Sequence, residues 1–198
     1  MIANYKALGF HSVWNTSAAM VDPEKITNNL AHVTAPSSIS LKPIRTVDFE
    51  KLFRYNTSVF GTPRKKLLDK CINIPGSLGW ASVDEKGDII GYNVVKQVIS
   101  GAGTETGLVM APLYADNHLV ARMLLKVAAD TYLATDAVPR SSFELFYSDR
   151  GSYGDHASRL MSEVEAKTVF LGQRMYTKGI PQGRQISKMY GISSTAFD

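Results

Sequence analysis

The stretch GLVMAPLYADNHLVARMLLKVAAD, residues 107–130, decides the fold. Its first five residues are typical of a buried strand, and Pro112, which cannot donate to a sheet ladder, predicts a stop or a bulge followed by a turn. A helix is expected next, because apolar residues recur at three- and four-residue spacing on one face: Leu119, Val120, Met123, Leu124, Val127 and Ala128. Asp116 or Asn117 can cap this helix. A strand that feeds directly into a helix leaves backbone N–H groups free at the helix start, and such a start attracts anions, above all phosphate.

The composition indicates an ordinary globular protein. With 198 residues the chain has room for one full α/β domain plus an extension. The net charge of +4 is a mild basic bias, and the one basic cluster, residues 64–66, is typical of a solvated helix face, which argues against a nucleic-acid partner. The single cysteine, Cys71, excludes an internal disulfide and fits a reducing compartment. No apolar run approaches the ~20 residues of a membrane helix, and no signal-peptide pattern opens the chain, so we expect a cytoplasmic protein without a membrane partner.

Residue spacing also argues against several common kinds of site. The four histidines lack the spacing of metal ligands, so we expect no metal: His11, His32, His118 and His156. The glycines at 101, 103 and 107 mimic a dinucleotide fingerprint, but they precede a strand where the fingerprint must follow one. No nucleophile-elbow pattern is present either, which argues against a Ser-His-Asp hydrolase.

The chain divides into an unusual beginning and a regular remainder. Residues 3–10 are typical of a helix end capped by Gly9, a strand is expected over 11–20, and residues 34–38 have the polar composition of a linker. Further strands are expected at 39–44, 80–83, 89–99, 143–147 and 168–176, and helices at 49–59, 64–72 and 157–166, with a last extended segment at 192–197. Strands that come first as a hairpin run and then alternate with helices predict an α/β domain with a mixed sheet.

This order of elements resembles the GNAT superfamily, the acyl-CoA-dependent N-acyltransferases. In that family a loop of the type V-x-P-x-x-Q-G-x-G-x-G joins the fourth strand to the third helix and is followed by a pair of leucines. Here Pro112 keeps its distance to the apolar run at 123–125, whereas Ala115 replaces the Gln or Arg. The glycine positions hold larger residues: Asp116, His118 and Val120. Side chains there keep a diphosphate further from the backbone, and Asp116 adds a negative charge beside it.

Three further segments resemble the C-terminal, YitH-type GNAT domain of tandem GNAT proteins. They are APLYAD at 111–116, RMY at 174–176 and YGISSTAF at 190–197. The segment YKALGF, residues 5–10, is similar to the end of the fourth helix of an ordinary GNAT domain. The resemblance therefore implies that residues 1–36 are the remnant of a preceding GNAT-like domain plus a linker, and that 37–198 form a GNAT-like domain. That fold is α/β, with a mixed, mostly antiparallel sheet and flanking helices.

The resemblance implies transfer of an acetyl group from acetyl-CoA, as co-substrate, to an amine of a small molecule or peptide, and it leaves room for a homodimer. The alternative is a catalytically weak or inactive GNAT-like module that binds a ligand or supports a partner domain. The degenerate phosphate loop favours this alternative. So does Met161, which falls nearest to the position of a tyrosine that protonates the departing thiolate in ordinary GNAT enzymes, since a thioether has no proton to donate.

Candidate cofactor-binding residues lie on both sides of Pro112. Backbone amides at Val109, Met110 and Ala111 can hold the thioester carbonyl and the pantetheine arm, or serve as a plain sheet edge. The arm is expected at the split between the strand at 107–111 and the strand at 143–147. At the helix start, the candidates for an open diphosphate groove are Asp116, Asn117 and His118, although a histidine there can also be simply solvated.

Candidate catalytic residues come from two later segments. Glu144 and, after it, Asp149 can act as the base that accepts the amine proton, or be surface carboxylates. Tyr147 and Tyr190 can act as an acid or contact a substrate, or be packing aromatics.

Overall fold

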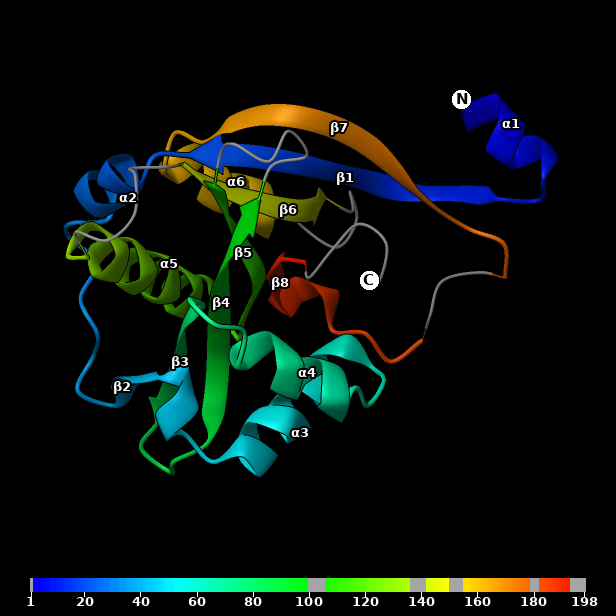
Figure 1. Ribbon diagram of the computed structural model, residues 1–198. Coiled ribbons are helices and arrows are strands. Elements are labelled where there is room, and N and C mark those ends of the chain that lie inside the picture. Colours follow the sequence, from blue (N-terminus) through cyan, green and yellow to red (C-terminus); the bar gives the residue numbers. More distant parts are fainter. Residues whose placement is uncertain (1, 100–105, 136–141, 150–154, 179–181, 193–198) are drawn as a thin grey trace.

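The computed structural model describes residues 2–99, 106–135, 142–149, 155–178 and 182–192. Its described part is organised around one open sheet in the order β2-β3-β4-β5-β6-β1-β7, with β8 paired to β5 (Figure 1). The strands are β1 (His11–Val21), β2 (Ile39–Pro43), β3 (Leu78–Asp84), β4 (Ile89–Ile99), β5 (Thr106–Ala115), β6 (Phe143–Asp149), β7 (Lys167–Tyr176) and β8 (Met189–Gly191). Neighbours pair antiparallel except β5 and β6, which are parallel. The predicted mixed, mostly antiparallel sheet is confirmed.

Helices cover both faces of the sheet (Figure 1). The covering helices are α2 (Pro23–Asn29), α3 (Phe49–Phe60), α4 (Lys65–Ile72), α5 (His118–Leu133) and α6 (His156–Glu163), whereas α1 (Ile2–Ala7) has no buried residue. Buried residues of α2, α5 and α6 share one core, and those of α3 and α4 form a second core with β3 and β4. Strand β5 contributes to both, because successive side chains point to opposite faces: Leu113 enters the first core and Tyr114 the second.

Strand β5 does not stop at Pro112, so the predicted turn there is wrong and the predicted bulge is right. Met110 pairs with Val95 and Leu113 pairs with Asn93, which leaves two residues on β5 opposite one on β4. Pro112 lies inside this irregularity, where the missing N–H is not needed by the ladder. The strand can therefore continue to Ala115, and α5 begins only three residues later.

The predicted cap at Asn117 is confirmed, and α3 has a cap of the same kind at Asp48. The Asn117 side chain accepts a hydrogen bond from the Val120 amide at 3.1 Å, and the Asp48 carboxylate accepts from the amides of residues 50 and 51. Other boundaries moved. Helix α4 begins at Lys65 and α6 ends at Glu163, earlier than the expected residue 166. The extended segment expected at 192–197 lies, after residue 192, outside the described residues, as does the loop at 150–154.

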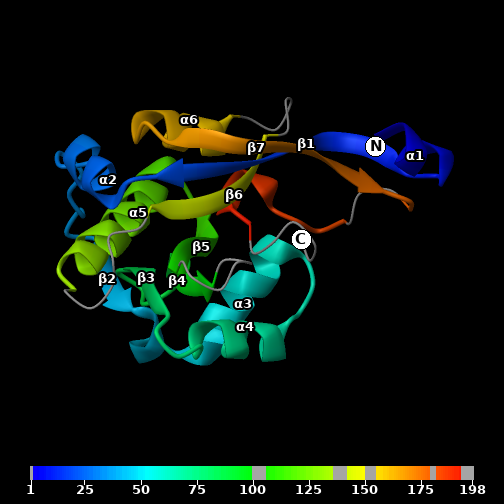
Figure 2. The ribbon, with the colours of Figure 1, turned by 45° about the horizontal axis from the view of Figure 1, so that its top comes forward.

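Strand β1 lies inside the sheet, between β6 and β7, and pairs antiparallel with both. Ala18 and Ala19 are fully buried there. Figure 2 shows β1 and β7 side by side, with α1 standing beyond the end of the sheet. Residues 11–21 thus complete the sheet formed by the rest of the chain, and a domain boundary at residue 36 stays a prediction.

Candidate active site

The sheet opens between β5 and β6. The two strands pair over only three positions, Leu108 to Met110 on β5 opposite residues 143–145 on β6. Beyond Met110 the β6-facing edge of β5 is no longer paired with β6, although β5 continues to Ala115. A backbone edge of this kind can hydrogen-bond to any extended segment placed in the split.

In this structure the extended segment is the chain's own β8. Leu113 pairs with Gly191 and Tyr114 pairs with Met189. On the other side of the split, the Ile192 amide donates to the Phe146 carbonyl of β6 at 2.7 Å. Residues 189–192 therefore bridge the two strands at the place where they separate, as Figure 1 shows for β8.

Side chains anchor β8 between two histidines. Tyr190 is 2% exposed, and its ring centroid lies 4.8 Å from that of His156 and 5.9 Å from that of His118. His156 Nε2 donates to the Met189 carbonyl at 3.2 Å. Burial raises the pKa of Tyr190 to about 12; Arg159 opposes the shift and Glu163 adds to it. The phenol of Tyr190 is consequently protonated across the neutral range.

The start of α5 is occupied rather than open. Lys188 Nζ lies 2.9 Å from Asp116 Oδ1, and the Tyr55 hydroxyl donates to the same oxygen at 3.1 Å. The Asn117 side chain caps the helix by accepting the hydrogen bond from the Val120 amide. His118 Nε2 lies 2.9 Å from Glu163 Oε1 of α6. The expectation of an open diphosphate groove at these residues is therefore corrected: side chains of the C-terminal segment and of α6 already contact them.

The Glu163 carboxylate contacts three basic side chains of this region. His118, Arg122 and Arg159 all approach its carboxylate, at 2.9, 2.9 and 3.3 Å. Desolvation raises the pKa of Glu163, but the hydrogen bond and charge of His118 and the charge of Arg122 outweigh it, so the pKa is lowered from its ordinary value. This cluster ties α6 to the start of α5.

The three residues whose amides are predicted to bind the cofactor differ in how close they lie to the split. Val109 and Met110 belong to the stretch that pairs with β6, and Met110 also pairs with Val95 of β4. Ala111, 1% exposed, is the first residue past that pairing. Among the three, Ala111 is the one that borders the split.

The predicted catalytic residues lie on different faces of the sheet. Tyr147 and Tyr190 are buried in the same core, 5% and 2% exposed. Glu144 is half-buried, and it points to the opposite face of β6 because it alternates with Phe143 and Leu145, which enter the core. The structure thus places the two tyrosines in one core and sets Glu144 apart. Met161 is 3% exposed in the same core, whereas the side chain of Asp149 lies outside the described residues.

A buried polar network next to β5 was not predicted. The Asn56 amide donates to the Tyr92 hydroxyl at 2.5 Å, and Arg64 donates to Asn56 Oδ1 and to the Tyr114 hydroxyl at 3.2 and 2.8 Å. The Arg64 guanidinium also lies 3.6 Å from the centre of the Phe60 ring. Tyr92 and Tyr114 are partners in the β4–β5 register, which local periodicity does not reveal. Lys188 was missed for the same reason, since its contact with Asp116 spans two distant parts of the chain.

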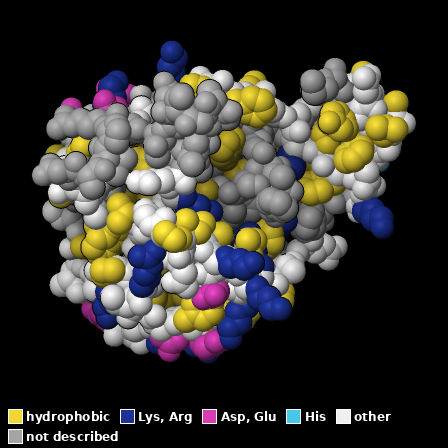
Figure 3. Space-filling model, in the orientation of Figure 1, with side chains coloured by type: hydrophobic (Ala, Val, Ile, Leu, Met, Phe, Trp, Pro, Cys, Tyr) yellow, Lys and Arg dark blue, Asp and Glu magenta, His cyan; other side chains and the backbone are white. Residues whose placement is uncertain are grey.

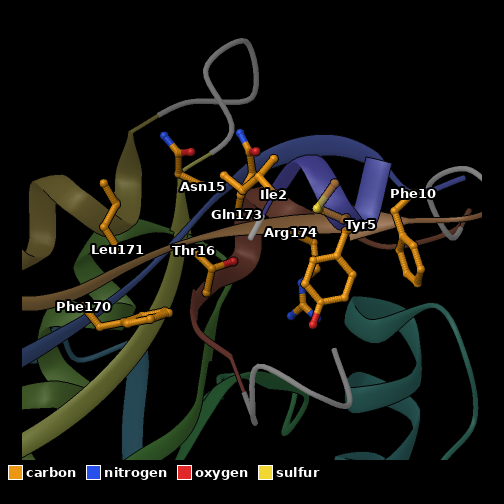
Figure 4. Close-up of a pocket in the computed structure, with 11 residues that line it drawn as sticks. Ile2, Tyr5, Phe10, Asn15, Thr16, Phe170, Leu171, Gln173 and Arg174 are labelled. Carbon is orange, nitrogen blue, oxygen red and sulfur yellow. The ribbon is translucent and has the colours of Figure 1, made fainter. Parts of the chain in front are cut away.

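Two surface features lie away from the split. A cavity of about 570 Å³ separates α1 from β7 and is lined by Tyr5, Phe170 and Arg174 among others (Figure 4). Lys and Arg side chains gather on the face over α3, α4 and the segment before β8 (Figure 3). In the segment before β8, the Arg184 guanidinium lies 4.5 Å from the centre of the Phe60 ring, and the Lys188 ammonium lies 5.9 Å from the centre of the Tyr55 ring. The basic face therefore borders β8, whereas the cavity does not.

Over the residues whose placement is described, no three His, Cys, Asp or Glu side chains gather in a way that could hold a metal ion. None of the helices in this part of the chain has the length and apolar character needed to cross a membrane.

Structural comparison shows where this fold belongs. The "putative acetyltransferase" of Pyrococcus horikoshii matches 98% of the chain with a TM-score of 0.66 and 16% identity, and the chain covers 56% of that protein. A GCN5-related N-acetyltransferase from Sphaerobacter thermophilus matches 93% (TM-score 0.59, 12% identity, 58% of its length). A functionally unknown conserved protein from Staphylococcus epidermidis matches 88% (TM-score 0.61, 6% identity, 65% of its length). At these identities the likeness defines the fold, and the chain spans between half and two thirds of each structure.

The fold, with its parallel strand pair that opens beside a strand-to-helix junction, is that of the GCN5-related acetyltransferases. A model of the acetyltransferase (GNAT) domain matches residues 52–191, and the chain belongs to this family. Comparison with curated protein sequences finds no match.

Proposed function

We propose that this chain transfers an acetyl group from acetyl-CoA to an amine of a small molecule or peptide. The family assignment supports acyl transfer. The observation that carries the proposal is the β5 edge at Leu113 and Tyr114, which engages an extended backbone in the split. A pantetheine arm, which carries amide groups along an extended chain, can make the same kind of pairing.

The reaction needs two proton transfers. The amine attacks the thioester carbonyl carbon, the C–S bond breaks, one proton leaves the nitrogen and one reaches the departing thiolate. We assign Glu144 as the base. Tyr147 of β6 is the acid, and Tyr190 of β8, in the same core, is the second candidate. We assign the thioester carbonyl to the Ala111 backbone, which borders the split.

Two assays test this proposal. Acetyl-CoA that binds only the folded chain raises its melting temperature, by an amount that grows with concentration. Incubation with acetyl-CoA and a panel of amines should release free CoA thiol, and Glu144→Gln should lower that release while leaving the thermal shift in place. Thermal shift without any amine-dependent thiol release would reduce the proposal to binding alone.

A second function is favoured by β8 itself. This function is that of a catalytically weak or inactive GNAT-like module, which binds another ligand or supports a partner domain. Such a module does not need an empty split, so β8 can stay docked. Met161 also fits this function, because its thioether has no proton to donate. Absence of both a thermal shift and thiol release at millimolar acetyl-CoA would select this function over the transferase.

A further inference from the structure

The C-terminal segment occupies the position that an extended ligand would take in the split. Its backbone pairs with β5 at Leu113 and Tyr114 and reaches β6 through the Ile192 amide. The same two strand edges cannot serve β8 and a second extended chain at once, because each backbone group faces only one partner on that side. A ligand that pairs with β5 in the split must therefore compete with β8.

Packing around β8 is tight enough to exclude a ligand while it is docked. A Cβ at Gly191 would lie 3.2 Å from Leu113 Cβ and 3.3 Å from the Leu113 nitrogen. Met189, Tyr190 and Ile192 are at most 4% exposed. No room for a pantetheine arm is left between Gly191 and β5.

The attachment of the segment suggests how it could leave. Before β8, the chain is fixed at α3, where the Gln185 amide donates to the Val59 carbonyl at 2.9 Å and Gly61 packs on Gly183. β8 itself is three residues long and has two register pairs on β5. Few ladder bonds therefore oppose its detachment from β5, and the cost of detachment lies mainly in exposing the buried side chains of residues 189–192. The anchor at α3 can hold the segment while residues 186–192 detach.

We propose that β8 is a displaceable internal occupant of the donor site, so that acetyl-CoA binds in the split only after residues 186–192 leave β5. This proposal rests on the proposed function, because it takes acetyl-CoA as the ligand. It makes donor affinity depend on the docking equilibrium of β8: the apparent affinity equals the intrinsic affinity multiplied by the fraction of molecules whose split is open.

A reversible lock tests the proposal in one chain. In a Cys71→Ala background, the substitutions Leu113→Cys and Gly191→Cys introduce two cysteines at paired positions of β5 and β8. Their Cβ atoms lie near the separation that a disulfide requires, so oxidation can link β8 to β5. Circular dichroism establishes folding, and calorimetry measures acetyl-CoA binding to the oxidised and reduced forms. We expect the oxidised form to bind at least about tenfold more weakly, because β8 can no longer leave.

A second variant, which weakens the docking of β8, should raise acetyl-CoA affinity instead of lowering it. This test does not depend on the disulfide. Gly191→Val presses against Leu113 and should raise acetyl-CoA affinity several-fold. Ser187→Val, an exposed position of the same segment, is the matched control and should bind like the wild-type chain.

The outcomes separate this proposal from the proposed function. Equal binding to the oxidised and reduced forms, with amine-dependent thiol release intact, would overturn the displacement of β8 and leave acyl transfer standing. Absence of binding in every folded form, including the reduced lock and Gly191→Val, would overturn both.

Discussion

The Lys188 ammonium lies 2.9 Å from the Asp116 carboxylate, and this pair joins the segment that leads into β8 to the end of β5. The two side chains are 27% and 33% exposed, so solvent screens the pair only in part. Asp116, which on sequence alone opposes an anionic ligand, is thus neutralised from within the chain. The contact also fixes the last turn before β8 at the start of α5.

Removal of this pair should loosen the fold slightly. Lys188→Ala is expected to lower the free energy of unfolding by about 0.5–1 kcal/mol, measured by urea denaturation. The control is Lys25→Ala, which breaks the more exposed Lys25–Glu165 pair and should cost less. An equal or larger loss for Lys25→Ala would mean that Lys188 does not hold the segment.

The helix cap at Asn117 can be tested by a matched pair of substitutions. Asn117→Ala removes the acceptor of the Val120 amide and should cost about 1 kcal/mol. Asp155→Ala, at the equivalent position of α6, should cost little, because its side chain makes no cap hydrogen bond. Chemical denaturation measures the free energy of unfolding of both variants. Similar losses in the two would contradict the assignment of Asn117 as the cap.

Tyr190 should stabilise the fold mainly through the packing of its ring rather than through its hydroxyl group. Tyr190→Ala opens a cavity between His156 and His118, with an expected loss of about 3–5 kcal/mol, whereas Tyr190→Phe keeps the ring and should cost about 1 kcal/mol or less. Thermal melts measure both. If Phe costs as much as Ala, the hydroxyl rather than the ring packing holds β8.

The Glu163 cluster predicts a specific loss of stability in acid. The pKa of Glu163 is lowered in the folded chain from its ordinary 4.5, so its contribution is fully present above about that value and is lost as pH falls through the folded pKa. Glu163→Gln should flatten this part of the curve of unfolding free energy against pH. Exposed Glu85→Gln serves as the control for general acid sensitivity, and identical curves for Glu163→Gln and the wild-type chain would rule out the linkage.

Local signals in the sequence predicted most of the elements. The apolar spacing of residues 118–130 and the Asn117 cap predicted α5, and the polar turn at 84–88 predicted the β3–β4 hairpin. Both depend on neighbours within a few residues, where periodicity and capping act. Pro112 was misread as a turn because the compensating bulge lies in its pairing with β4, which is a property of two strands rather than of one.

Pairings across long stretches of chain could not be predicted from the sequence. The insertion of β1 between β6 and β7, and the pairing of β8 with β5, bring together residues more than 70 positions apart. Three residues such as Met189–Gly191 carry no periodic signal strong enough to indicate a strand. The β5–β6 split was predicted as the candidate site on the basis of a family resemblance and stays a prediction, whereas its internal occupant, β8, was not anticipated.

Hydrogen exchange of the wild-type chain tests the central claim most directly. Acetyl-CoA at saturating concentration should increase amide exchange at residues 186–192, as β8 leaves, while the amides of Ala111 and of residues 113–115 stay protected by the incoming ligand. Binding of acetyl-CoA with unchanged protection at 186–192 would contradict the account, because the donor would then lie elsewhere than in the split that β8 fills.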